Sequence, residues 1–121
     1  MTVSRLDVIE SELLKLGALD AELASLKLQG GNVRARDLQR LAQTMGFGPK
    51  RKKRGGEPTW IRDSGTTISI PDHSGTLGKG LASKIIKGMR DELFIMTEAL
   101  KDEKEVISGQ TNQLKYRNYY D

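Results

Sequence analysis

Hydrophobic side chains recur at helical spacing near both ends of the chain. Leucine and isoleucine repeat every three or four positions over residues 4–28, and a shorter stripe of the same kind covers residues 33–45. Gly46 follows that stripe, where a left-handed cap would end a helix. A third stripe predicts a long helix over residues 79–107. Its expected apolar face consists of Leu81, Ile85, Met89, Leu93, Met96 and Leu100.

The period changes between the second and third helical segments. Short runs that favour strands alternate there with glycine and proline. Asp63-Ser64-Gly65 is a strong hairpin signal between two of these runs. In the last run Ile68 and Ile70 are expected to face inward and Ser69 outward. The three predicted strands are residues 50–54, 59–62 and 67–70.

The order of these elements predicts an α+β fold. A three-stranded antiparallel sheet would carry helices on one face, in the order α-β-β-β-α, and its other face would be open. The apolar stripe of the N-terminal helical extension can pack on the C-terminal helix or form the seam of a coiled-coil dimer. We favour packing within the chain, because three heptads with a glycine inside are few for such a seam. The expected divisions are an extension over 1–31, the α-β-β-β-α domain with its long last helix over 32–109, and a polar tail over 110–121.

Length and composition narrow the class of protein. With 121 residues the chain has room for one small domain, and its net charge of +4 is mildly basic. It has no cysteine, which excludes disulfides and thiolate metal sites, and its single histidine argues against zinc. No apolar run is long enough for a bilayer, and no signal peptide is evident. We therefore expect a cytoplasmic protein without a cofactor, a metal or a membrane partner.

The positive charge is concentrated near the first predicted strand. Five basic residues stand in a row there, and Glu57 is the sole acid between residues 47 and 62. Such a run can bind phosphates without sequence preference. It can also be an edge strand that uses lysine to prevent pairing, or a chance match to a nuclear-localisation signal. The basic residues of this region are Lys50, Arg51, Lys52, Lys53, Arg54 and Arg62.

An ordered set of motifs runs through the middle of the chain. A helix ends in Gly46-Phe47, a basic strand leads into Gly55-Gly56, and a hairpin turns at Gly65. The segment Ile70-Pro71-Asp72-His73-Ser74-Gly75 follows, and Lys79-Gly80 then opens the last helix. With these features residues 35–96, about half of the chain, resemble HicA, the small mRNA-interferase toxin of HicA–HicB toxin–antitoxin systems.

The resemblance implies a double-stranded-RNA-binding-like fold, RNA cleavage, and a HicB-like antitoxin as protein partner. In the family a catalytic histidine follows a Gly-Ser pair after the first strand. Alignment on Gly65 and Pro71 puts Glu57 at that position. The chain therefore departs from the family at the residue that matters most for catalysis.

The residues present can still be assigned to RNA cleavage. A base takes the 2′-OH proton, an acid protonates the leaving 5′-oxygen, and cations stabilise the charge that develops on the phosphorus centre. Glu57 would be ionised at pH 7 and suits the base, whereas His73 suits the acid or a phosphate ligand. The bland alternatives are a surface ion pair for Glu57 and a turn residue for His73. The expected phosphate contacts are Lys52, Arg54 and Lys79.

Trp60 has two interpretations. Its indole can stack on an RNA base, but its place in a strand of a small sheet favours packing in the core. The leading functional hypothesis is a HicA-like, metal-independent RNA endoribonuclease toxin that acts on mRNA. One alternative is a non-catalytic RNA-binding module on the same fold. Another is an interaction protein whose helical termini bind a partner, including a second copy of the chain.

Overall fold

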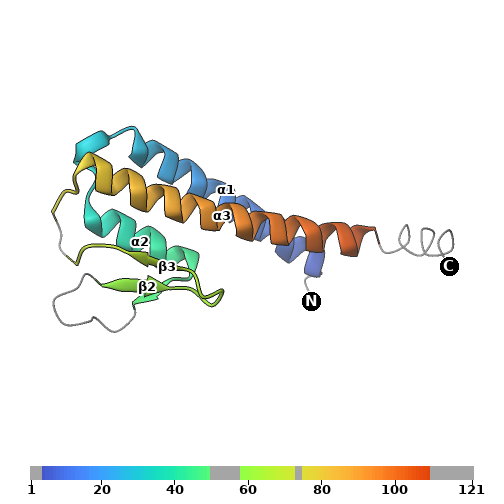
Figure 1. Ribbon diagram of the computed structural model, residues 1–121. Helices are drawn as coiled ribbons and strands as arrows, with labels where there is room; N and C mark the ends of the chain where they lie inside the picture. The colour runs from blue at the N-terminus through green and yellow to red at the C-terminus, as the bar shows by residue number, and fades with distance from the viewer. Residues whose placement is uncertain (1–3, 50–57, 73–74, 110–121) are drawn as a thin grey trace.

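The chain folds as a small α+β protein, as predicted. The computed structural model describes residues 4–49, 58–72 and 75–109. Three helices and a three-stranded antiparallel open sheet make up the architecture (Figure 1). The elements in order are α1 (Arg5–Lys27), the short 3-10 helix η1 (Gly30–Asn32), α2 (Ala35–Met45), β1 (Gly48–Pro49), β2 (Thr59–Ile61), β3 (Thr67–Ser69) and α3 (Lys79–Ser108).

The sheet has the strand order β1-β2-β3, and the helices lie on one side of it (Figure 1). Trp60 of β2 pairs with Pro49 on one side and with Ile68 on the other. Ile70 is fully buried and Ser69 is exposed, which confirms the predicted alternation. β1 consists of Gly48–Pro49, and the residues predicted for the first strand, 50–54, lie outside the described residues.

The N-terminal helix packs within the chain. α1 is one continuous helix through Gly17, and it runs antiparallel to α3. Arg5 pairs with Glu103 at 2.6 Å, and Asp20 pairs with Arg90 at 2.8 Å. This confirms that the apolar stripe of the N-terminal helix packs on the C-terminal helix of the same chain, and not in the seam of a coiled coil. The buried leucines of α1 join the same core as the buried residues of α2 and α3. These leucines are Leu16, Leu19, Leu23 and Leu26.

α2 ends as its sequence indicates. Gly46 has a φ of 101°, a left-handed conformation that costs glycine little because it has no Cβ. Phe47 donates its backbone N–H to the carbonyl of Ala42 at 2.9 Å, and its ring is buried. The cap thus turns the chain from α2 into β1 and brings the ring of Phe47 into the hydrophobic core.

α3, with 30 residues, is the longest helix in the described part of the chain. Its first half covers the sheet, and its second half extends past the sheet beside α1 (Figure 1). Most of the predicted apolar face is buried or partly buried against the core, but Leu81 is 38% exposed, because Ala82 takes the inward position in the first turn. No helix in the described part of the chain is long and apolar enough to cross a membrane.

Candidate nucleic-acid interface

The described lysines and arginines divide into two groups by position. The first group lies along the helices and at the hairpin, and its members form ion pairs with N–O distances of 2.6–3.9 Å. The paired residues are Arg5, Lys15, Arg40, Arg62, Lys87, Arg90, Lys101 and Lys104. The remaining cations of the described residues have no ion-pair partner there. They are Lys27, Arg34, Arg36, Lys79 and Lys84, and we call this set the cationic end.

The cationic end is where three helix termini meet. α1 stops at Lys27, η1 turns the chain, and α2 begins beside the start of α3, at the left of Figure 1. Arg34 forms an antiparallel bridge with Thr76. All of the side chains of the cationic end are exposed. Unpaired exposed cations from three elements therefore share one end of the molecule.

A backbone clip holds this end together. The N–H of Leu77 donates to the carbonyl of Val33 at 2.7 Å, and the N–H of Ala35 donates to the carbonyl of Gly75 at 3.0 Å. Val33 and Leu77 are both buried. The clip fixes the entry of α3 relative to the entry of α2, so the positions of Arg34 and Lys79 depend on each other.

The sheet leads into the same region. The N–H of Ile70 donates to the carbonyl of Pro58 at 3.3 Å, and Gln39 Nε2 of α2 donates to the carbonyl of Pro71 at 2.6 Å. Pro58 directly follows Glu57, and Ile70 lies three positions before His73. A backbone hydrogen bond thus joins the residue that follows Glu57 to the end of β3, three positions before His73.

Acidic residues are few in this region. Asp37 lies in the first turn of α2, where a carboxylate is favoured by the helix dipole. Asp72 lies in the segment that joins β3 to α3, and it has an interaction of its own. No three histidine, cysteine, aspartate or glutamate side chains gather into a metal site among the described residues. Positive charge therefore predominates on the described part of this end.

Most predicted site residues fall in two segments that are not described. Lys79 is the only one of the predicted phosphate contacts in the described part of the chain, and it is exposed at the start of α3. The predictions for the other residues lie outside the described residues. These are Lys50, Arg51, Lys52, Lys53, Arg54, Glu57 and His73.

Trp60 is a core residue. Its side chain is 7% exposed and belongs to the hydrophobic cluster under the helices. Base stacking by Trp60, one of the two sequence interpretations, is therefore corrected: the ring faces the protein because alternation along β2 points it to the helix side. Its Nε1–H is buried and has no hydrogen-bond partner among the described residues.

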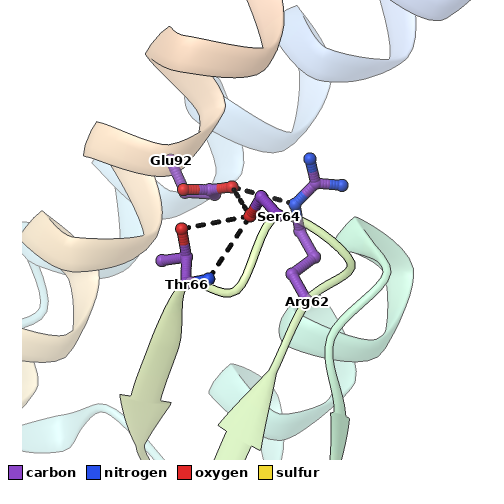
Figure 2. A network of polar contacts seen from close by, with 4 residues as sticks. All are labelled: Arg62, Ser64, Thr66 and Glu92. Atoms are coloured by element: carbon purple, nitrogen blue, oxygen red, sulfur yellow. Dashed lines mark hydrogen bonds and ion pairs between the residues drawn. The ribbon is translucent and has the colours of Figure 1, made fainter.

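Arg62 also has a role inside the protein. Its Nε donates to Glu92 Oε1 at 2.9 Å, and Glu92 is 2% exposed on α3 (Figure 2). The hydroxyl of Ser64 donates to the same oxygen at 2.9 Å and lies 3.1 Å from Thr66 Oγ1. Arg62 is thus engaged by the hairpin and α3, and its sequence-based assignment as an RNA contact stays a prediction.

The network lowers the pKa of Glu92. Burial alone would raise it, because the charged form loses hydration. Hydrogen bonds from Arg62 and from the hydroxyls of the turn, together with the positive charge of Arg62, outweigh burial and leave the pKa below its ordinary value. Glu92 is therefore an ionised buried carboxylate, and it fastens the β2–β3 hairpin to α3.

Sequence reasoning missed most of the cationic end. Arg34 and Arg36 stand beside Asp37, and Lys27 follows a mixed-sign helix. Each has the appearance of an ordinary surface charge in the sequence. No sequence signal distinguishes them, because only the fold shows which cations have an acidic partner.

Comparisons with known proteins identify no relative. No family model matches the chain, no curated protein matches it, and no solved structure matches it. The resemblance to HicA therefore rests on the sequence motifs alone.

Proposed function

We propose that this protein is a HicA-like RNA endoribonuclease that binds the RNA backbone at its cationic end. The observation that carries the proposal is the division of the cations: those without a partner among the described residues gather where three helices begin or end. RNA presents a regular row of negative charges, and unpaired lysine and arginine side chains bind it by releasing counterions. A surface whose cations are already paired would gain little in this way.

The basic run extends this surface in the proposal. Pro49 directly precedes it, and the carbonyl of Pro58, which follows Glu57, accepts a hydrogen bond from Ile70 just after β3. In the proposal Lys50 to Arg54 add further phosphate contacts to that of Lys79. Arg62 and Trp60 are not part of the surface, for the reasons given above. The agreement of the element order with the expected α-β-β-β-α order supports a fold like that of double-stranded-RNA-binding domains.

Cleavage in the proposal uses the two candidate positions, Glu57 and His73. Glu57 takes the proton from the 2′-OH, because a carboxylate among cations stays ionised at neutral pH. His73 donates a proton to the leaving 5′-oxygen. Lys79 and the basic run stabilise the negative charge that develops on the phosphoryl oxygens. No metal takes part. The proposal includes a cytoplasmic toxin held inactive by a HicB-like antitoxin.

A second candidate function is RNA binding without cleavage. It is favoured by one observation, the glutamate at the position where the HicA family has its catalytic histidine. A glutamate starts near a pKa of about 4.3 and is a poor proton donor at pH 7. The cationic end serves this candidate equally well, so binding data alone cannot separate the two.

The deciding experiment is RNA cleavage by the purified full chain in excess EDTA. We expect cleavage by the wild type, and its loss in Glu57→Ala and in His73→Ala. Glu105→Ala, at the other end of α3, is the matched control and should cleave like the wild type. If the wild type leaves RNA intact but retards it in a gel, the second candidate stands. If it neither cuts nor binds RNA at low salt, both proposals are wrong.

A further inference from the structure

The solvent face of α1 carries no charge over four turns. Amphipathic surface helices usually present charged or polar side chains to water. Here the outward positions from residue 14 to residue 28 are apolar or small, and Leu14 and Leu28 are 78% and 90% exposed. We call these residues the α1 face. They are Leu14, Gly17, Ala18, Ala21, Ser25 and Leu28, all exposed.

Apart from Lys27, which belongs to the cationic end, the charged side chains of this part of α1 lie on the flanks of the face and are paired within the chain. Lys15 pairs with Glu12 at 3.6 Å along α1 itself. On one flank Asp20 pairs with Arg90 of α3 at 2.8 Å. On the other flank Glu22 pairs with Arg40 of α2, also at 2.8 Å. The carboxylates that border the centre of the α1 face are thus neutralised by arginines of the same chain.

Gly17 gives a second indication. Glycine in the middle of a helix costs about 1 kcal/mol relative to alanine. A Cβ at Gly17 would meet nothing within 4 Å, so no contact within the described chain requires the glycine. Gly17 also leaves α1 unbroken. A residue this small on an exposed face allows the backbone of another helix to come close.

The α1 face is nearly symmetric about Ala21. Equal steps in both directions from Ala21 reach Gly17 and Ser25, then Leu14 and Leu28, and Ala18 is matched by the partly buried Ala24 at the border of the face. A two-fold axis through the middle of an antiparallel helix pair relates such positions to each other. Leu14 of each copy would then meet Leu28 of the other copy. The two leucine contacts would lie about 21 Å apart along the helix pair, with small residues between them.

We infer that the α1 face is the homodimer interface of this protein, formed with the α1 face of a second copy in antiparallel orientation. The occupant fits because a surface with this internal symmetry is complementary to itself. The charges that are paired on the two flanks add no net repulsion between the two copies. The inference does not depend on the proposed RNA function.

Charge decides the orientation. A parallel pair would place the two cationic ends side by side, where unpaired like charges repel. The antiparallel pair keeps them apart, at opposite ends of the two helices. In the antiparallel pair the first turns of each α1 also point toward the cationic end of the second copy. These turns carry Asp7 and Glu10, both exposed on the same outward side. Opposite charges thus approach at both ends of the interface.

The first test is the mass of the full chain in solution, measured by light scattering after gel filtration. We expect twice 13.4 kDa for the wild type. Ala21→Glu puts two carboxylates at the two-fold axis and should give the monomer, with unchanged helix content by circular dichroism. Ala99→Glu on the exposed side of α3 is the matched control and should stay dimeric. A monomeric wild type at about 100 μM, or a dimeric Ala21→Glu, would overturn the inference.

The second test uses the absence of cysteine from the chain. Ala21→Cys should form a disulfide-linked dimer under mild oxidation, because residue 21 faces its own copy across the axis. Ala99→Cys should not. Leu14→Cys and Leu28→Cys should cross-link with each other when mixed, and neither should cross-link alone. Efficient cross-linking of Leu14→Cys with itself would contradict the antiparallel orientation.

Discussion

Arg62, just after β2, donates to the buried carboxylate of Glu92 on α3 at 2.9 Å, and the two residues lie 30 positions apart in the chain. Through this contact the β2–β3 turn and the long helix are held together (Figure 2). Ser64 adds a hydrogen bond to the same oxygen. Glu92 is the one buried charged residue among the described residues, and its ionised form depends on the positive charge of Arg62.

Removal of that cation should be costly. Arg62→Met leaves Glu92 buried with only hydroxyl donors, and we expect the free energy of unfolding to fall by about 2–4 kcal/mol. The double variant Arg62→Met/Glu92→Leu should recover most of that loss, because apolar replacement of both partners is often neutral. Urea denaturation measures both. A loss of less than about 0.5 kcal/mol in the single variant would show that the pair contributes little.

Acid should weaken the same contact. The pKa of Glu92 is lowered in the folded state, so its contribution to stability is complete above the unfolded value of about 4.3. The contribution is lost as the pH falls below that value and through the folded pKa, since the unfolded chain then binds the proton more readily. We expect thermal unfolding, measured from about pH 3 to pH 6, to show a steeper loss of stability for the wild type than for the double variant. This range extends about one to two units on either side of the unfolded value. Parallel curves would refute this.

Loss of charge at the cationic end should weaken RNA binding. Arg34→Ala/Arg36→Ala removes two unpaired cations, and we expect the slope of log affinity against log salt to fall by about 1–2. Arg5→Ala/Lys104→Ala removes two paired cations far from this end and is the matched control. Its slope should stay near that of the wild type. Equal effects of the two double variants would mean that net charge, and not its position, governs binding.

Trp60 should report on the core. It is the only tryptophan, so fluorescence is specific to it. Because its ring is buried, we expect emission at short wavelength and weak quenching by acrylamide. Trp60→Phe should keep RNA affinity within about two-fold, since base stacking is typically worth about 1–3 kcal/mol per base. A loss of affinity of ten-fold or more in a folded Trp60→Phe would restore the stacking hypothesis.

Two glycines should respond to alanine in opposite directions. Gly46→Ala forces a side chain into the left-handed conformation and should destabilise the protein by about 1 kcal/mol. Gly88→Ala lies inside α3, and its Cβ would meet Ile68 Cγ2 at 3.6 Å, an ordinary contact. It should stabilise by about 0.5–1 kcal/mol through helix propensity. Chemical denaturation of both variants under one set of conditions checks the signs.

The sequence by itself determined the elements of this protein. Helical spacing of leucine and isoleucine located the three helices, because burial of one face sets that period. Gly46 and Asp63-Ser64-Gly65 marked a cap and a turn, since both depend on local backbone geometry. Inward Ile68 and Ile70 followed from strand alternation. Each of these properties is set within a few residues, and each is confirmed by the structure.

Only the tertiary structure decided which side chains are available for function. Arg62 and Arg34 look alike in the sequence, yet one is paired with a buried carboxylate and the other has no ion-pair partner among the described residues. The α1 face likewise emerged only when α3 and α2 had taken up the charges on either side of it. The physical reason is that pairing and burial depend on contacts between residues far apart in the chain, and hydrophobic periodicity carries no record of those contacts.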